Sequence, residues 1–311
     1  MLAVVAVAGS IIIALLQGTP ESGFLELLSF MAISAYRIMP SLSRINGAVM
    51  LMRGQEYVLD TMEQGCLHPQ PTKNVPPRTL NTPLKGIQLS DITLSYDALE
   101  APVLDHLEHT FGAGKIHGIV GPSGSGKSTI INALLGLHKP KRGSIQIQFA
   151  DNDSIALNED IDLHTWVLNV AYLSQQPFLF QGSVEDNLTL RVPGTKVNEE
   201  RVASLIHRLK LTDCLGASPL TFDLQEGGSN LSGGQQQRLA LLRALQIQRP
   251  VLILDEATSA LDSELRDVVF GLLRERAQEG CNVILVTHDK DLAARCDDVL
   301  DLGASPKTPA A

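Results

Sequence analysis

The feature that most restricts the fold of this 311-residue chain is a glycine-rich segment that follows a short apolar run. The segment is Gly121-Pro122-Ser123-Gly124-Ser125-Gly126-Lys127-Ser128, which fits the pattern G-x-x-x-x-G-K-[ST]. The run Ile116–Val120 before it is typical of a buried strand, and the stretch Ser128–Leu137 after it is typical of a helix. Glycines at these spacings let consecutive backbone N–H groups turn toward an anion, and the helix N-terminus adds positive potential. The segment therefore predicts a phosphate-binding loop in an α/β domain.

The residue types in this loop predict individual roles. We expect Lys127 to bridge the β- and γ-phosphates of a nucleotide and Ser128 to place its hydroxyl on Mg²⁺. The remaining positions expected to contact the nucleotide here are Gly121, Pro122, Ser123, Gly124, Ser125, Gly126 and Thr129. A glycine turn without a ligand is the alternative, and the flanking strand and helix argue against it.

A second apolar strand ends in two carboxylates. Val251–Leu254 is short and fully apolar, and Asp255 and Glu256 follow it directly. A parallel strand next to the phosphate loop would place its C-terminal end at the ligand crevice. We expect Asp255 to hold Mg²⁺ through water and Glu256 to polarise the attacking water. A solvated acidic loop is the alternative, and the phosphate loop makes it much less favoured.

The segment Leu231-Ser232-Gly233-Gly234-Gln235 resembles the signature of the ATP-binding cassette (ABC) family. Physically it is another anion cradle, with a serine hydroxyl and glycine amides opening a predicted helix over 235–245. The two cradles lie about 110 residues apart, so they are expected to face different nucleotides or different chains. The resemblance implies a head-to-tail dimer, in which Ser232, Gly233, Gly234 and Gln235 of one subunit close over ATP in the phosphate loop of another.

Further elements of the same family occur in the expected order. Tyr96 lies 25 residues before Gly121 and matches the aromatic residue that stacks on adenine. Gln175 matches the glutamine that contacts Mg²⁺ and the membrane domain. Asp262 ends the segment 259–262, which matches the loop across the dimer interface, and His288 matches the histidine that contacts the γ-phosphate. The alternatives are a core tyrosine at position 96 and a structural histidine at position 288.

The resemblance covers residues 86–301 most strongly. It implies an α/β P-loop NTPase cassette with a helical subdomain, with ATP and Mg²⁺ as cofactors and ATP hydrolysis as the activity. The alternating apolar residues after Gly86 and the apolar run Val283–Val286 agree with strands of such a domain.

The N-terminal region has a different composition. Leu2–Leu16 is almost wholly apolar, and a second apolar stretch, Phe24–Met39, follows a polar turn. The pair predicts a helical membrane hairpin, and a buried soluble hairpin or a signal peptide are the alternatives. Arg37 lies near the end of the second stretch, Arg44 and Arg53 follow it, and the turn has no basic residue, so the downstream chain is expected in the cytoplasm.

The segment 24–46 resembles the last membrane helix of ABC exporters, nearest to the branch that moves lipid-linked oligosaccharides or peptides. We therefore expect a partial transmembrane domain over 1–65, a proline-rich linker over 66–86 and the nucleotide-binding domain over 87–311. The resemblance implies six membrane helices in an exporter half, against at most two here. We interpret the sequence as an exporter half that is truncated at its N-terminus or reduced to a remnant.

Composition restricts the function classes. The net charge of −9 argues against nucleic acid as a partner, because nucleic-acid binding needs a basic surface. The four cysteines lack metal-site spacing and are expected as free thiols. The expected partners are the cell membrane and a second ABC subunit, identical or homologous. One alternative is a soluble regulatory or DNA-repair ABC ATPase, which would need a coiled-coil insertion or a second cassette, and the sequence shows neither. The other is a non-enzymatic partner with a degenerate site, and the presence of Asp255, Glu256 and His288 argues against it.

Overall fold

The computed structural model describes residues 83–303, except 97–100, 158, 162, 193–194 and 259–260, together with ten residues between Phe30 and Ile45. The chain divides into two units, one ending at Thr72 and one beginning at Lys73, and the fold below belongs to the second. The predicted membrane stretch 2–16 and most of the stretch 24–39 lie outside the described residues. Within the part of the chain that is described, no helix combines the length and the apolarity needed to cross a bilayer.

A parallel sheet of five strands forms the centre of the second unit, as far as the described residues show. Its strands are β3 (Ile116–Val120), β6 (Val170–Leu173), β9 (Val251–Asp255), β10 (Asn282–Val286) and β11 (Asp298–Asp301). They lie in the order β11-β3-β10-β9-β6, and every neighbouring pair is parallel. The α/β class and the three strands predicted from apolar runs are therefore confirmed.

The strands β9 and β10 are apolar throughout because both faces of this sheet are covered. Leu252 and Leu254 of β9 pack into a core cluster with residues of the helices α6 (Glu199–Arg208), α8 (Gly233–Gln246) and α9 (Ser263–Gln278). Val251 and Ile253 point to the other face and join the cluster under the second sheet. Successive strand residues point to opposite faces, so burial on both sides requires a continuous apolar run. Each such side chain contributes about 1.5–3 kcal/mol when fully buried.

An antiparallel sheet of four strands covers one face of the domain. It consists of β1 (Leu84–Leu94), β2 (Leu104–Gly112), β4 (Arg142–Phe149) and β5 (Ser154–Ala156), in the order β2-β1-β4-β5. Ile87 of β1 lies opposite Phe111 on one side and opposite Ile147 on the other. The alternation of apolar residues after Gly86 reflects this half-buried position, and β1 begins at Leu84.

Helices connect and cover the two sheets. These are α3 (Lys127–Leu134), α4 (Leu163–Val167), α9 (Ser263–Gln278) and α10 (Lys290–Ala294). The helix α3 begins at Lys127 of the glycine-rich segment and ends at Leu134, three residues before the predicted Leu137. Gly136, two residues after its end, adopts a positive φ of 76°.

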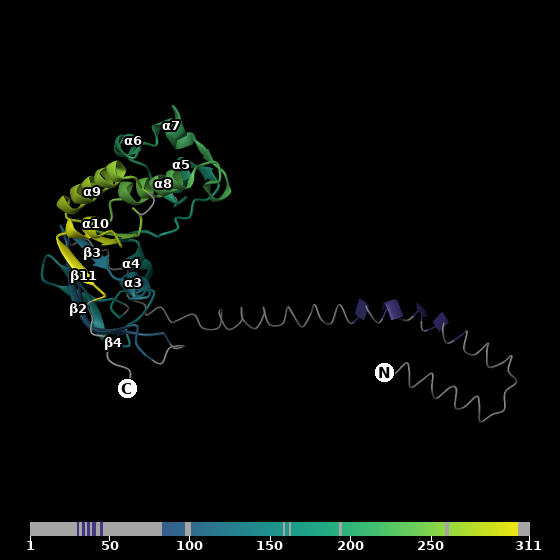
Figure 1. Cartoon of the computed structure of the whole chain (residues 1–311), viewed down its shortest axis with the longest axis horizontal. Helices are drawn as coiled ribbons and strands as arrows, with labels where there is room; N and C mark the ends of the chain where they lie inside the picture. The colour runs from purple at the N-terminus through teal and green to yellow at the C-terminus, as the bar shows by residue number, and fades with distance from the viewer. Residues whose placement is uncertain are drawn as a thin grey trace, which may run out of the picture. The chain divides into compact units, whose positions relative to one another are not determined.

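A helical subdomain lies between β6 and β9 in the sequence. It contains α5 (Val184–Thr189), α6 (Glu199–Arg208), α7 (Thr212–Leu215), α8 (Gly233–Gln246), the short ribbon β7 (Gly182–Ser183) with β8 (Asp223–Leu224), and the 3₁₀ turns η1 (Pro219–Thr221) and η2 (Glu226–Gly228). Figure 1 shows α5 to α8 grouped at one end of the domain, with β2 and β4 at the other. Cys214, Cys281 and Cys296 are free thiols, and Cys66 lies outside the described residues.

Candidate nucleotide site

Three glycines of the loop, Gly121, Gly124 and Gly126, have a positive φ, and at two of them an added side chain would also clash with its surroundings. Gly121 has a φ of 152°, and a Cβ there would lie 2.5 Å from the hydroxyl oxygen of Ser125. Gly126 has a φ of 98°, caps α3, and a Cβ there would lie 2.9 Å from Leu104. A side chain at either position would meet strain and a steric clash. At Gly124, by contrast, a Cβ would meet open space, as expected where a ligand approaches the backbone.

The loop carries polar side chains that could contact a bound anion. Lys127 donates through Nζ to the carbonyl oxygens of Gly121, at 2.8 Å, and Pro122, at 2.9 Å, which holds the ammonium over the loop. The hydroxyl of Ser125 is buried and has no hydrogen-bond partner among the described residues. A buried hydroxyl without a partner costs about 1–3 kcal/mol, so a ligand oxygen would satisfy it. Ser128 is exposed at the start of α3. These donors fit the phosphates of a nucleotide.

The two carboxylates after β9 differ in environment. Asp255 is half-buried, and burial together with the neighbouring Glu256 raises the pKa of its carboxyl, while Lys127 and a hydrogen bond from Tyr172 act in the opposite direction. Glu256 has a φ of 51°, an uncommon conformation for a non-glycine residue, and its N–H donates to the carbonyl of Val286 at 3.1 Å. The backbone is thus turned sharply at the end of β9, and strained residues of this kind occur often at functional sites.

Three of the predicted site residues meet at Glu256. Gln175 Nε2 donates to Glu256 Oε2 at 2.8 Å, and His288 Nδ1 lies 3.9 Å from Glu256 Oε1. Gln175 follows β6, Glu256 follows β9 and His288 follows β10, so the C-terminal ends of three parallel strands bring them together. His288 is 65% exposed, which leaves it open to a ligand.

Tyr96 lies close to the start of α3. Its hydroxyl is 3.5 Å from the hydroxyl of the buried Thr129, and its ring centroid is 4.7 Å from that of His138, with the planes tilted by 40°. The side chain is 39% exposed, so it is not the core tyrosine of the alternative interpretation. Its position beside the phosphate-loop helix suits a base-stacking role.

The predicted signature is at the other cradle, the N-terminus of α8. Ser232 caps the helix by accepting from the N–H of Gln235, and the amide oxygen of Gln235 accepts from the N–H of Ser232 at 2.8 Å. This capping box explains why α8 begins at Gly233, ahead of the predicted start at Gln235. It also directs the Gln235 side chain back onto its own helix. A Cβ at Gly233 or Gly234 would meet open space.

A buried side chain connects the signature helix to the acidic strand end, and another caps the helix that follows the predicted interface loop. Gln237 of α8 is buried and donates to the carbonyl of Ala257, one residue after Glu256, at 2.8 Å. Asp262 caps α9 by accepting from the N–H of Leu265 at 2.8 Å. Ser259 and Ala260 of the predicted interface loop lie outside the described residues.

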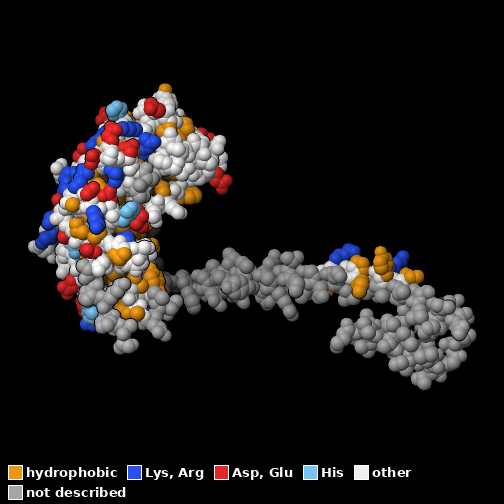
Figure 2. Space-filling model, in the orientation of Figure 1, with side chains coloured by type: hydrophobic (Ala, Val, Ile, Leu, Met, Phe, Trp, Pro, Cys, Tyr) orange, Lys and Arg blue, Asp and Glu red, His pale blue; other side chains and the backbone are white. Residues whose placement is uncertain are grey.

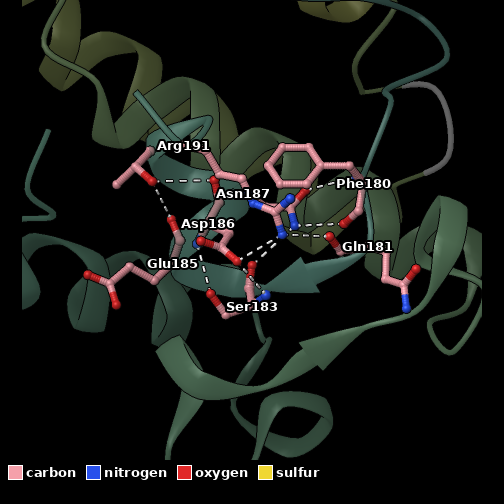
Figure 3. A network of polar contacts seen from close by, with 8 residues as sticks. Phe180, Gln181, Ser183, Glu185, Asp186, Asn187 and Arg191 are labelled. Atoms are coloured by element: carbon pink, nitrogen blue, oxygen red, sulfur yellow. Dashed lines mark hydrogen bonds and ion pairs between the residues drawn. The ribbon is translucent and has the colours of Figure 1, made fainter. Parts of the chain in front are cut away.

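A polar network anchors the segment that follows Gln175 (Figure 3). Asp186 accepts from the N–H of Ser183 at 3.2 Å and from Arg191 at 3.1 Å, and Arg191 lies over the ring of Phe180 with 4.9 Å to its centroid. The hydrogen bond from Arg191, followed by that from Ser183, lowers the pKa of Asp186. Asn187 both accepts from and donates to the backbone of Phe180. These contacts connect α5 to the segment that precedes it, from Phe180 to Ser183.

A cavity of about 730 Å³ lies at the opposite end of the sheet from these residues. Pro250, Cys281 and Gly114, which precede β9, β10 and β3, are among its lining residues. None of the predicted site residues lines it, so the chemistry of the side chains, and not cavity size, locates the nucleotide site.

Sequence reasoning did not find every residue near this site. Tyr172 of β6 forms a hydrogen bond with Asp255, and His138 packs against Tyr96. Tyr172 lies three residues before Gln175 on a strand adjacent to β9, and this position could have indicated its contact with Asp255. No pattern in the sequence indicated the contact of His138 with Tyr96.

A strand, a glycine loop with its lysine, and an acidic end on a second parallel strand, separated from the first by β10, define a P-loop nucleotide-binding domain. A family model described as ABC transporter matches residues 104–259, half of the chain. The chain belongs to the ABC transporter family, and its cassette is the ATPase domain of that family.

The chain is similar to several named transporters over part of their length. The chain is 35% identical over 229 residues to the ATP-dependent lipid A-core flippase of Burkholderia orbicola, covering 73% of this chain and 37% of the relative. It is 36% identical over 271 residues to the mycobactin import ATP-binding/permease protein IrtB of Mycolicibacterium smegmatis, covering 84% and 43%. A solved bacterial Atm1-family ABC exporter with ATP bound matches with a TM-score of 0.66 and 25% identity, covering 89% and 47%. The chain thus spans less than half the length of each of these proteins.

Proposed function

We propose that this chain binds and hydrolyses MgATP to power export by an ABC transporter. The observation that carries the proposal is the meeting of Gln175 and His288 at Glu256, beside Asp255 and the phosphate loop. A phosphoryl-transfer site needs a group that orients the attacking water and cations or N–H donors that stabilise the transferred phosphoryl group. The described residues supply both at one edge of the sheet.

Each residue has a distinct role in this proposal. Glu256, fixed by Gln175, accepts a hydrogen bond from the attacking water, and the exposed His288 ring contacts the γ-phosphate from the other side. Lys127 turns from the loop carbonyls to the β- and γ-phosphate oxygens, where it stabilises the charge of the transition state. Tyr96 stacks on the adenine ring.

The residues present also fit a hard divalent cation. Mg²⁺ prefers oxygen ligands, and Ser128, Gln175 and Asp255 offer a hydroxyl, an amide and a carboxylate at this edge. Burial, and after it the nearby charge of Glu256, raises the pKa of the Asp255 carboxyl, and a bound cation would favour its charged form. Mg²⁺, when bound, neutralises charge on the phosphate oxygens. The hydroxyl of Ser125 and the ammonium of Lys127 can donate to the phosphates whether or not the ion is bound.

We propose that two cassettes act head to tail. The cradle at Ser232, Gly233 and Gly234 opens a helix of fourteen residues, and a Cβ at either glycine would meet no atom of its own chain within 4 Å. A helix N-terminus with accessible N–H groups binds phosphate well. This helix, however, belongs to the helical subdomain, whereas the phosphate loop follows a strand of the parallel sheet. A second cassette would bring its own γ-phosphate to this cradle.

The export function and the cellular location rest on the relatives and on the N-terminal region. Phe30, Ile33, Tyr36 and Met39 are each more than 60% exposed on described helical positions about three residues apart, and Figure 2 shows hydrophobic and basic side chains together there. We propose that this region belongs to a membrane domain and that the cassette is cytoplasmic. The lipid A-core flippase relative supports a lipid-linked saccharide as cargo, with a peptide as the second candidate. The mycobactin relative is named an importer, so the cassette is common to both directions of transport.

The test is the substitution Glu256→Gln. We expect ATP binding to be retained and turnover to fall by roughly a hundredfold or more, because the water-orienting carboxylate is lost while the phosphate loop is intact. The measurements are nucleotide affinity by fluorescence titration and phosphate release. Glu264→Gln, at an exposed glutamate that pairs with Lys210, is the matched control and should hydrolyse ATP like the parent. Turnover of Glu256→Gln within a few-fold of the parent would refute the role of Glu256.

A further inference from the structure

A second cluster of metal-ligating side chains lies outside the nucleotide site. It consists of His109 on β2, His117 on β3 and Asp298 on β11, whose ligand atoms all lie within 4.8 Å of one another. Asp298 Oδ2 is 3.5 Å from His109 Nε2 and 3.6 Å from His117 Nδ1. His117 is four residues before Gly121, which places the cluster about 13 Å from the phosphate loop along β3.

A hydrogen bond to the backbone selects the tautomer of the neutral His117 ring. Its Nε2 lies 3.0 Å from the carbonyl oxygen of Gly112, which can only accept a hydrogen bond. The neutral ring therefore carries its proton on Nε2 and presents a lone pair on Nδ1 toward Asp298. Metal-ligating histidines are commonly oriented by a backbone carbonyl in this way.

The ligand atoms of both histidines are buried without hydrogen-bond partners. His117 is 2% exposed, and neither its Nδ1 nor the Nε2 of His109 has a partner among the described residues. The distances to Asp298 exceed those of an ordinary N–H···O bond, which are about 2.7–3.2 Å. They match the spacing of about 3.3 Å between ligands that share a tetrahedral ion at about 2.0–2.1 Å.

Asp298 completes the donor set and leaves a path from solvent. Its Oδ1 accepts from the N–H of Val299 at 2.9 Å, which directs Oδ2 to the histidines. Its side chain is 46% exposed, whereas that of His109 is 13% exposed, so an ion could enter from this side and retain a water.

We propose that His109, His117 and Asp298 bind one divalent transition-metal ion of the Zn²⁺ class. Two imidazoles and a carboxylate are a common set for such ions and a poor one for Mg²⁺ or Ca²⁺. The ion would connect β2 of the antiparallel sheet to β3 and to the edge strand β11 of the parallel sheet. It would thereby stabilise the strand that leads into the phosphate loop.

The experiment is a titration of the full chain, purified without a histidine tag and freed of metal by a chelator, with Co²⁺ and with Zn²⁺. We expect one equivalent of Co²⁺ to bind with a visible d–d absorption band that Zn²⁺ displaces, and Zn²⁺ to raise the melting temperature. Asp298→Asn and His109→Gln should weaken binding about tenfold or more. His106→Gln, at an exposed histidine of the same strand that pairs with Asp91, should bind like the parent.

Asp298→Asn is the decisive variant, since its side chain is half exposed and its loss does not open the core. Unchanged binding in this variant, no saturable binding at micromolar Zn²⁺, or loss of binding in His288→Ala, which would place the ion at the nucleotide site, would each overturn the proposal.

Discussion

Two glycine-rich helix N-termini occur in this domain, and they are built differently. At α3, Gly121 and Gly126 adopt positive φ values and pack closely against their own chain, and Lys127 is held by the carbonyls of the loop. At α8, Gly233 and Gly234 face open space, and the capping box uses only the N–H groups of Ser232 and Gln235. The first is preorganised within one chain. The second has space around its glycines, which fits its proposed contact with a nucleotide bound to another subunit.

The largest expected effects are on ATP binding and hydrolysis, and they differ between the phosphate loop and the signature at α8. Lys127→Ala should weaken ATP binding by about 10- to 100-fold, because a charge-assisted contact to phosphate of about 1.5–3 kcal/mol is lost. Ser232→Arg should leave ATP binding nearly unchanged and abolish hydrolysis, because it blocks the cradle offered to the other subunit. Both are measured by nucleotide titration and phosphate release, with Ser229→Arg at a nearby exposed serine as the control.

Mixing these two variants tests the comparison directly. In a mixed dimer one composite site contains neither substitution, so part of the activity should return. If no mixture ratio restores hydrolysis, the two cradles do not belong to a shared site.

The next effect concerns stability. Gly126→Ala should destabilise the domain by about 1–3 kcal/mol, because it forces a Cβ into a positive-φ conformation and against Leu104. Gly234→Ala should leave stability unchanged or raise it by up to about 1 kcal/mol, since it lies in the first turn of α8 with space around it. Denaturant unfolding of both variants measures this, and equal losses would mean that the two loops are equally packed.

The smallest effect is at the adenine end of the first cradle. Tyr96→Phe should change ATP affinity little, whereas Tyr96→Ala should weaken it by about 1–3 kcal/mol, because stacking uses the ring face. The hydroxyl contributes only a long contact of 3.5 Å to Thr129. A large loss of affinity in the Phe variant would instead assign Tyr96 a hydrogen-bonding role.

Much of the fold was predictable because its determinants are local. A continuous apolar run such as Val251–Leu254 indicates a strand in a sheet that is covered on both faces. The phosphate loop requires glycine where its backbone adopts a positive φ. Element ends were less predictable. The start of α8 depended on a capping box, and the end of α3 on the positive φ of Gly136.

For the site, the sequence by itself determined the residue types and their order: a loop that can cradle phosphate, a carboxylate pair after a strand, and a second cradle far along the chain. Only the tertiary structure decided which side chains meet. The strand order β11-β3-β10-β9-β6 brings Gln175, Glu256 and His288 to one edge, although they are far apart in sequence. The same order places Asp298 beside His117, and the second sheet adds His109. Such pairings depend on which strands are neighbours, and local sequence patterns carry no information about that.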